Sequence, residues 1–369
     1  MPERPAPPRP VPGPGGPLVT ADRVSFRLRA AADLAGAWLV NEVAQPRGGW
    51  AFRPGPPGGP WQLDFPRPPV DRMEYLFELV SGDGDTELVC DPDNPLRAAG
   101  PFGDKSVVEF PGYRPPAWLR AAGGPRGTVA ELAIPAPSLG APQRAELWTA
   151  PGVAAGARAP LLVVHDGIEY ARYASLTLLL DRLCAGGALP PMRAALLHPG
   201  RRDEHYSASP RYAHALVGEV LPALVDGPAP TPPGRRFRVG MGASLGALAM
   251  LHAHRSHPHA FGGLLLQSGS FFHHRFDPHD LGFEHFQRIR RFMDRVHAAR
   301  QFDQPVPVVL TCGTVEQLLP NNRATSLALR HQGYRVQFVQ SRDAHNWVAW
   351  RDQLHPHLTG LLGDVWHAP

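Results

Sequence analysis

Ser244 lies in a stretch that could present a reactive hydroxyl. Residues 242–246 read GASLG, a glycine–serine–glycine spacing that suits nucleophilic chemistry. An apolar, strand-like run from Phe237 to Met241 precedes it, and a helical pattern from Leu245 to Arg255 follows. A sharp turn between the two would strain the serine backbone and expose its hydroxyl. The pattern therefore predicts that Ser244 attacks a carbonyl carbon; the alternative is an ordinary glycine-rich turn.

A serine hydroxyl is a weak nucleophile near neutral pH and needs an adjacent base. His345 follows the last strand-like run, Arg335 to Gln340, and is the candidate base. Glu316 follows the run before it, where a carboxylate could orient the imidazole and stabilise its cation. Asp343 is the rival acid, although it would have to turn back onto a ring only two residues away. A serine–histidine pair without a carboxylate is the third alternative.

Acyl transfer also needs backbone N–H groups aimed at the oxygen of the tetrahedral intermediate. Leu245, immediately after the serine, is one expected donor. The second is assigned to Gly167 or Ile168, because these residues follow the apolar run Leu161 to His165 and glycine permits a close backbone approach. The alternative is a simple β-turn, for which the dipeptide at 166–167, Asp-Gly, is a common signal.

An alternating α/β arrangement would position these residues. From about Thr128 onwards, apolar runs typical of buried parallel strands alternate with helical patterns. The strand-like runs are 128–134, 143–149, 161–165, 193–197, 237–241, 263–267, 306–311 and 335–340. The helical patterns cover 175–185, 212–224, 245–255, 283–299 and 323–331, and one more follows His345. We expect an α/β-hydrolase fold, with a mostly parallel sheet between helices on both faces.

A chain of 369 residues exceeds the usual size of one domain. Residues 1–20 are rich in proline and glycine and are expected to form a flexible tail. Residues 21–118 show short alternating runs separated by turn signals, which predicts a small β-sandwich. Residues 119–127 are interpreted as a linker, and residues 128–369 as the catalytic domain.

The composition argues against several partners. The 37 basic residues slightly outnumber the 33 acidic ones, but they are scattered, so we expect no nucleic-acid binding. The three cysteines show no metal-type spacing, and neither a metal ion nor an organic cofactor is implied. No apolar stretch has the length of a membrane span or of a signal-peptide core, so the expected location is the cytoplasm. The sequence does not indicate the oligomeric state.

Several motifs together resemble the enterochelin esterase (ferric-enterobactin esterase) family of α/β-hydrolases. In the catalytic part they are His165-Asp166-Gly167, Arg202 with Glu204 and Tyr206, residues 242–246, residues 267–271 (QSGSF), His345-Asn346-Trp347 and Trp350-Arg351. In the amino-terminal part they are residues 75–79 (YLFEL) and 91–95 (DPDNP). The resemblance implies a serine esterase in which Ser244 and His345 are the catalytic pair, and the family's type substrate is a siderophore trilactone.

The sequence departs from this family at three positions. Ala247 replaces a second glycine after the serine turn, and Asn346 replaces an aspartate after the catalytic histidine. Glu204 is displaced by one residue in the family's Arg-x-x-Glu-Tyr pattern. This last change falls at the expected pocket rim, so the resemblance does not fix the substrate.

Three further residues are candidates for substrate binding. Arg202 and Tyr206 follow the run 193–197, on the rim where open α/β sheets bind ligands. Arg202 could bind an anionic group, or it could pair with Asp203 or Glu204. Phe271 begins an aromatic stretch that could line an acyl pocket or a lid, with plain helix packing as the alternative.

The sequence thus predicts a serine hydrolase acting on a small-molecule ester, a carboxylic ester of a small or medium-sized hydroxy compound. Two other functions stay open. An acyltransferase would use the same acyl-enzyme and pass the acyl group to a second alcohol. A catalytically silent binding protein would keep the fold without the chemistry.

Overall fold

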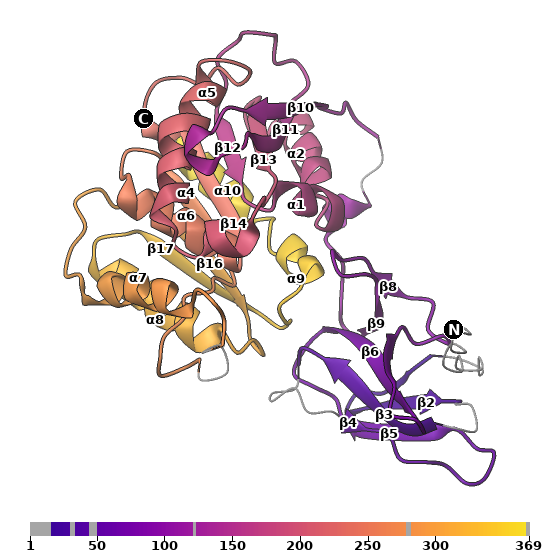
Figure 1. Ribbon diagram of the computed structural model, residues 1–369. Coiled ribbons are helices and arrows are strands. Elements are labelled where there is room, and N and C mark those ends of the chain that lie inside the picture. Colours follow the sequence, from indigo (N-terminus) through magenta and orange to yellow (C-terminus); the bar gives the residue numbers. More distant parts are fainter. Residues whose placement is uncertain (1–15, 30–33, 44–49, 121–122, 278–281, 367–369) are drawn as a thin grey trace, which may run out of the picture. The chain divides into compact units, whose positions relative to one another are not determined.

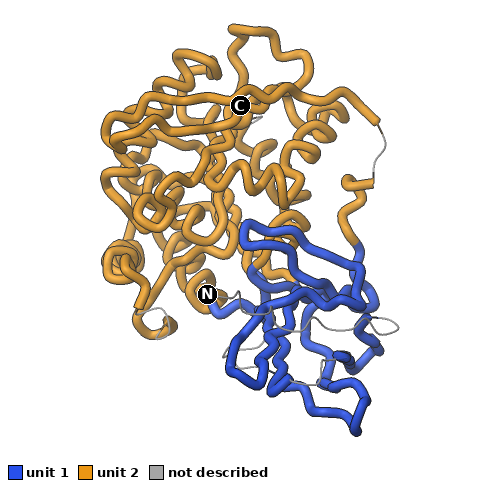
Figure 2. The backbone as a smooth tube through the Cα atoms, turned by 45° about the vertical axis from the view of Figure 1, so that its right-hand side comes forward, with its two compact units in different colours: residues 1–114, 313–317, 342–345 blue, residues 115–312, 318–341, 346–369 orange. Residues whose placement is uncertain are grey.

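The computed structural model describes residues 16–29, 34–43, 50–120, 123–277 and 282–366. Most of the expected flexible tail (residues 1–15) and part of the expected linker (residues 121–122) lie outside the described residues. The chain divides into two compact units, shown in Figure 2. Unit 1 comprises residues 1–114, 313–317 and 342–345; unit 2 comprises residues 115–312, 318–341 and 346–369.

Unit 1 is built from two antiparallel sheets. Its strands are β1 (Leu18–Val19), β2 (Arg23–Leu28), β3 (Leu34–Asn41), β4 (Trp50–Ala51), β5 (Trp61–Pro66), β6 (Arg72–Ser81), β7 (Thr86–Val89), β8 (Arg97–Ala98) and β9 (Lys105–Glu109). One sheet has the order β1-β2-β5; the other has the order β4-β3-β6-β9-β8, with β7 also paired to β6. In β2 and β6, every second side chain enters a core that holds Phe26, Tyr75 and Phe77. The predicted β-sandwich is confirmed.

One prediction at the amino terminus is wrong. Leu18 and Val19 lie in the segment that the sequence predicts to be a flexible tail, but they form strand β1. Their backbone pairs with β2 in the register Leu18↔Ser25 and Val19↔Val24. The pairing satisfies backbone groups that a proline-rich tail would leave to water.

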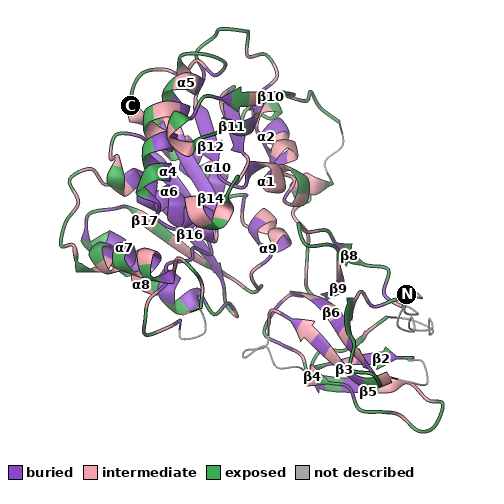
Figure 3. Ribbon diagram, in the orientation of Figure 1, coloured by how far each residue is buried: buried purple, intermediate pink, exposed green. Residues whose placement is uncertain are grey.

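Unit 2 contains one eight-stranded sheet with the order β10-β11-β13-β12-β14-β15-β16-β17. Its strands are β10 (Thr128–Ile134), β11 (Gln143–Thr149), β12 (Leu161–Val164), β13 (Arg193–Leu197), β14 (Arg238–Ala243), β15 (Gly263–Gln267), β16 (Val308–Gly313) and β17 (Val336–Ser341). The first two strands are antiparallel to their neighbours, whereas β13, β12, β14, β15 and β16 run parallel. The residues of β12 to β15 are buried, except the half-buried Arg238 that begins β14, and this burial explains the continuous apolar runs (Figure 3).

Helices cover both faces of this sheet (Figure 1). They are α1 (Gly167–Tyr173), α2 (Leu176–Ala185), α3 (Arg202–Tyr206), α4 (Pro210–Ala215), α5 (Leu221–Val225), α6 (Leu245–Ser256), α7 (Phe286–Ala298), α8 (Leu319–His331), α9 (Trp347–Asp352) and α10 (His357–Trp366). Helices α3 to α8 share one core with Leu161 and Val163 of β12, and α1, α2, α9 and α10 share the other with Leu162 and Val164. The alternation along β12 separates the two cores, so the α/β-hydrolase fold is confirmed.

The continuous helix expected over Tyr212–Leu224 differs from the structure. There, α4 passes into a π-helical turn, Leu216–Val220, before α5 begins. Pro222 stands in the second position of α5. Proline donates no N–H group, and its ring collides with the carbonyl four residues earlier in a regular helix. A π turn just before proline changes that spacing, and the helical segment continues from α4 into α5 without interruption.

Candidate active site

Ser244 occupies a strained turn between β14 and α6. Its backbone angles are φ 55° and ψ −123°, in a region that non-glycine residues rarely occupy. A Cβ atom on Gly242 would lie 2.5 Å from the backbone of Gly246, and one on Gly246 would lie 3.1 Å from Asp166 and His165. The two glycines therefore let the strand, the helix and the neighbouring loop approach closely around the serine. The turn predicted from the sequence is the one observed.

A second hydroxyl lies beside the serine. The Oγ atoms of Ser244 and Ser270 are 3.1 Å apart, and the Ser270 N–H donates to the Ser244 carbonyl at 3.1 Å. Ser270 is only 3% exposed, so its hydroxyl is held in place. The sequence analysis did not identify Ser270 as a functional residue, although it lies in the QSGSF motif. Contacts across strands do not appear in local patterns.

His345 and Glu316 form a hydrogen-bonded pair. Nδ1 of His345 lies 2.7 Å from Oε2 of Glu316, and the other carboxylate oxygen accepts the Gly313 N–H at 2.6 Å. The Glu316 side chain is 2% exposed and that of His345 is 33% exposed. A carboxylate fixed at both oxygens orients the ring through Nδ1 and leaves Nε2 as the nitrogen that could transfer a proton.

Asp343, the rival acid, has a different role. Its Oδ1 accepts the N–H of the next residue, Ala344, at 2.8 Å, and its side chain is largely buried. That hydrogen bond is made to the adjacent backbone. Of the two sequence candidates, the structure brings Glu316 to the histidine.

The expected oxyanion donors lie at the starts of two helices. Leu245 is the first residue of α6, and Gly167 and Ile168 are the first two residues of α1. The first N–H groups of an α-helix have no acceptor within the helix and are available to an oxyanion. Gly167 is required where it stands, because a Cβ atom there would lie 2.3 Å from Cα of Leu196. The alternative considered for this point, a simple β-turn, is not observed, because Gly167 begins α1.

His165 links these two helix starts. Its Nδ1 lies 2.9 Å from the Gly246 carbonyl, and the ring is 0% exposed. Burial lowers the pKa of His165 to about 4, outweighing the Gly246 hydrogen bond and the charge of Asp166, so the ring is neutral near pH 7. A neutral ring facing a carbonyl through Nδ1 carries its proton there and donates it. The loop before α1 is thus tied to the serine turn.

Arg202 is anchored by Asp166. Its Nε and Nη2 donate to the two carboxylate oxygens of Asp166 at 2.9 and 2.8 Å. The alternative pairing with Asp203 or Glu204 is not the one observed, and Glu204 pairs with Arg288 at 3.0 Å. Burial by itself lowers the pKa of Arg202, but the charge and hydrogen bonds of Asp166 more than offset this and raise it. The guanidinium is permanently charged and 34% exposed, so it can still meet a substrate.

Tyr206 and Phe271 are both 0% exposed. Tyr206 accepts the Asp166 N–H at 3.3 Å, and Phe271 belongs to the core on the α6 face. Neither side chain presents surface to a substrate in this structure. Both side chains contribute to the hydrophobic core, where large aromatic residues commonly pack.

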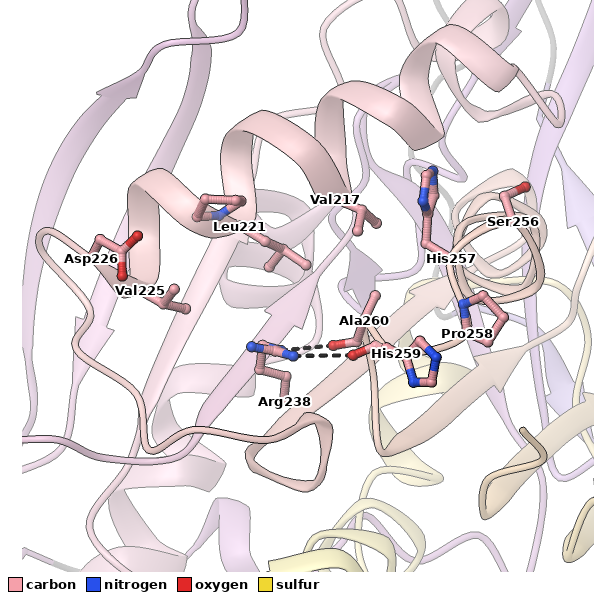
Figure 4. Close-up of a pocket in the computed structure, with 11 residues that line it drawn as sticks. Val217, Leu221, Val225, Asp226, Arg238, Ser256, His257, Pro258, His259 and Ala260 are labelled. Atoms are coloured by element: carbon pink, nitrogen blue, oxygen red, sulfur yellow. Dashed lines mark hydrogen bonds between the residues drawn. The ribbon is translucent and has the colours of Figure 1, made fainter. Parts of the chain in front are cut away.

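A groove of about 440 Å³ lies elsewhere in unit 2 (Figure 4). Val217, Leu221 and Arg238 are among the residues that line it. Arg238 is the first residue of β14, whereas Ser244 follows the last one, so the groove opens at the opposite end of that strand.

Within the described ranges, no three histidine, cysteine or acidic side chains are grouped to hold a metal ion. No helix there is long and apolar enough to cross a membrane.

The strained serine turn, the parallel sheet and the helices on both faces are the architecture of the α/β-hydrolase class. The family model described as "Putative esterase" matches residues 147–361, so the chain belongs to this family and is a carboxylic-ester hydrolase. The sequence has no match among curated proteins.

Several solved structures share the fold. Enterobactin esterase from Shigella flexneri, solved in the presence of enterobactin, has a TM-score of 0.74 at 21% identity, over 95% of this chain and 96% of that one. Ferric enterobactin esterase from Salmonella typhimurium has a TM-score of 0.73 at 20% identity, over 98% and 96%. A ferulic acid esterase has a TM-score of 0.55 at 18% identity, over 64% and 98%. The resemblance expected from the sequence motifs is confirmed, and it extends through unit 1.

Proposed function

We propose that the chain hydrolyses a carboxylic ester of a small or medium-sized hydroxy compound through an acyl-enzyme on Ser244. The observation that carries this proposal is the backbone of Ser244, held at φ 55° and ψ −123° between a buried strand and a helix. A protein maintains such strain where the surroundings over-determine it, and functional sites are where it is concentrated.

The residues act in sequence. Oγ of Ser244 attacks the ester carbonyl carbon while Nε2 of His345 takes the hydroxyl proton, and Glu316 stabilises the imidazolium through Nδ1. The N–H groups of Leu245 and of Gly167 or Ile168 stabilise the oxyanion. The tetrahedral intermediate collapses, and His345 gives its proton to the departing alcohol. Water, deprotonated by the same ring, then releases the acid and restores Ser244.

The substrate class is proposed from the fold and from Arg202. Solved structures with the same two-part fold include an enterobactin esterase with enterobactin present. Arg202 offers a partly exposed cation that an anionic or catecholate group would meet. A ferric catecholate siderophore is therefore the first ester to test, beside p-nitrophenyl esters of graded chain length.

Active-site labelling tests the proposal. A fluorophosphonate probe is expected to label the wild-type protein at Ser244, and Ser244→Ala should lose both labelling and p-nitrophenyl ester hydrolysis, by at least about 1,000-fold. Ser256→Ala, at the exposed end of the same helix, is the matched control and should retain both. Labelling that persists in Ser244→Ala would overturn the assignment of the nucleophile.

A further inference from the structure

The two loops that carry the acid and the base of the proposed mechanism fold with the β-rich part of the chain. Residues 313–317, which include Glu316, and residues 342–345, which include His345, belong to unit 1 (Figure 2). The sequence places both loops in the catalytic domain, some 200 residues after β9. Three contacts hold them.

The first contact is a main-chain hydrogen bond to the loop that carries His345. The N–H of Asp71 donates to the carbonyl of Arg342 at 2.8 Å, and the carbonyl of Asp71 accepts the Phe110 N–H at 3.0 Å. Asp71 therefore joins the loop to the sheet of β6 and β9. Its side chain also accepts from Nε of Arg342 at 3.0 Å, but both groups are about half exposed, and such pairs contribute little.

The second contact is electrostatic. Arg72, the first residue of β6, is 3% exposed and donates through Nη1 to Glu74 at 2.8 Å. Burial alone would lower the pKa of Arg72, but the charges of Glu74 and then Asp343 outweigh it and raise the pKa. Geometry supports the same relationship: Arg72 follows Asp71, which is hydrogen-bonded to Arg342, the residue before Asp343. The buried cation of Arg72 is therefore held on the strand next to the loop that carries Asp343, a largely buried carboxylate two residues from His345. Removing this cation would leave the buried negative charge of Asp343 less well neutralised, which would destabilise the loop.

The third contact is apolar and holds the loop that carries Glu316. Val315 packs against the core of unit 1 that contains Phe26, Tyr75 and Phe77. Gly313 completes the arrangement, because a Cβ atom there would lie 2.1 Å from the carbonyl oxygen of Asp343. The two loops therefore touch each other, and each is also anchored to the β-rich strands.

We propose that Arg72, Asp71 and Val315 are positioning residues for the Glu316–His345 pair, so that the β-sandwich is part of the catalytic apparatus. This inference rests on the proposed function of that pair. A histidine that must receive and return a proton has to stay within hydrogen-bond reach of its partners, and a displacement of about 1 Å can cost about 100-fold in rate. A core that fixes both loops limits such displacement.

Four variants of the full-length protein test the inference. Arg72→Met removes the cation with little change in volume, Arg72→Lys restores a charge, and Val315→Ala shortens the apolar anchor. Phe26→Leu is the matched control, because it perturbs the same core from β2 and leaves Asp71, Arg72 and Val315 in place. Each variant is assayed for kcat and KM on a p-nitrophenyl ester, for its free energy of unfolding in urea, and for amide hydrogen exchange at Gly313 and Ala344.

Arg72→Met and Val315→Ala should lower kcat, by about 10-fold to 100-fold for the first, with KM within about threefold of wild type. Exchange at Gly313 and Ala344 should accelerate in both, and Arg72→Lys should recover most of the lost kcat. Phe26→Leu should lose stability but keep its kcat and the slow exchange. If Arg72→Met does not fold, Val315→Ala and Phe26→Leu still give the comparison.

Two results would overturn the inference: folded Arg72→Met and Val315→Ala proteins with wild-type kcat and exchange, or a Phe26→Leu protein that loses kcat and protection equally. Failure of the proposed function is distinguishable from both. In that case the wild-type protein hydrolyses no ester and resists the fluorophosphonate, and the exchange rates alone decide whether unit 1 holds the loops.

Discussion

Oε2 of Glu316 lies 2.7 Å from Nδ1 of His345, although the two residues are 29 positions apart in the chain. The second oxygen of the carboxylate is held by the Gly313 N–H. The Glu316 carboxylate is therefore held in place independently of the ring, and its side chain is almost wholly buried. Hydrogen bonds to a carboxylate in such surroundings are about twice as strong as those between neutral groups.

Replacing Glu316 should separate the two sequence candidates for the acid. Glu316→Gln keeps the shape but removes the charge that stabilises the imidazolium, so kcat should fall by about 100-fold to 10,000-fold. Asp343→Asn should retain at least about ten times more activity than Glu316→Gln, because Glu316 is hydrogen-bonded to Nδ1 of the ring, whereas Asp343 accepts the Ala344 N–H. Steady-state hydrolysis of a p-nitrophenyl ester is the measurement. The reverse ranking of the two variants would make Asp343 the acid.

Gly313 should tolerate no side chain. In Gly313→Ala, the added Cβ atom would lie 2.1 Å from the carbonyl oxygen of Asp343. Neither atom can rotate away as a flexible side chain would, so the two loops must move apart. We expect kcat to fall by about 10-fold or more through displacement of His345.

Gly360→Ala is the matched control for this substitution. Gly360 lies inside α10, where a Cβ atom meets nothing within 4 Å. The same change there should leave kcat unaltered and stabilise the protein by about 0.5–1 kcal/mol, because alanine favours a helix interior over glycine. Urea unfolding and kcat are measured for both variants, and equal activities would show that the loops accommodate the methyl group.

The sequence allows the sheet of unit 2 and the serine turn to be predicted because both depend on local patterns. Buried parallel strands need continuous apolar runs, and the turn at Ser244 needs glycine at 242 and 246. Position after the last strand also identifies His345, since parallel strands bring their carboxyl ends to one edge.

Other features depend on contacts between distant segments, which a single sequence does not encode locally. Asp166 pairs with Arg202 from 36 residues away, in preference to the adjacent Asp203 and Glu204, because a bidentate geometry requires a carboxylate facing the guanidinium. Residues 313–317 and 342–345 likewise belong to unit 1 because of contacts with segments far away in the sequence. The sequence predicts Tyr206 at the rim and Phe271 in an acyl pocket or lid, but both are buried, because aromatic side chains near a site fill the core equally well.

His165 should matter for catalysis although it touches no reacting atom in the proposed mechanism. Its Nδ1–H holds the Gly246 carbonyl and so fixes the first turn of α6 against the loop before α1. In His165→Leu the carbonyl stays buried without its donor, which costs about 1–3 kcal/mol and loosens the oxyanion donors. We expect kcat to fall at least about tenfold with a smaller change in KM.

Two companions make this test specific. His165→Asn places an amide N–H close to the position of Nδ1 and should recover much of the activity. Tyr212→Phe alters a neighbouring ring, whose centroid is 5.5 Å from that of His165, and should leave kcat near wild type. If His165→Asn and His165→Leu are equally impaired, the ring volume is the important property and the hydrogen bond is not.

Acid should destabilise the protein through buried histidines, and His254 gives the sharpest test. Burial lowers its pKa from 6.5 to about 3. Below pH 6.5 the histidine of the unfolded chain binds a proton, whereas the buried ring of the native protein stays neutral until about pH 3. The free energy of unfolding therefore falls as the pH decreases from 6.5 towards 3, by up to about 1.4 kcal/mol per pH unit for this residue.

His254→Phe preserves the packing against Phe302 and Tyr334 and should reduce the slope of the stability curve between pH 6 and 4 by about that amount. His259→Phe, at an exposed position, should leave the curve unchanged. Urea unfolding at half-unit pH intervals supplies the comparison, and parallel curves for wild type and His254→Phe would mean that His254 takes up its proton equally in both states.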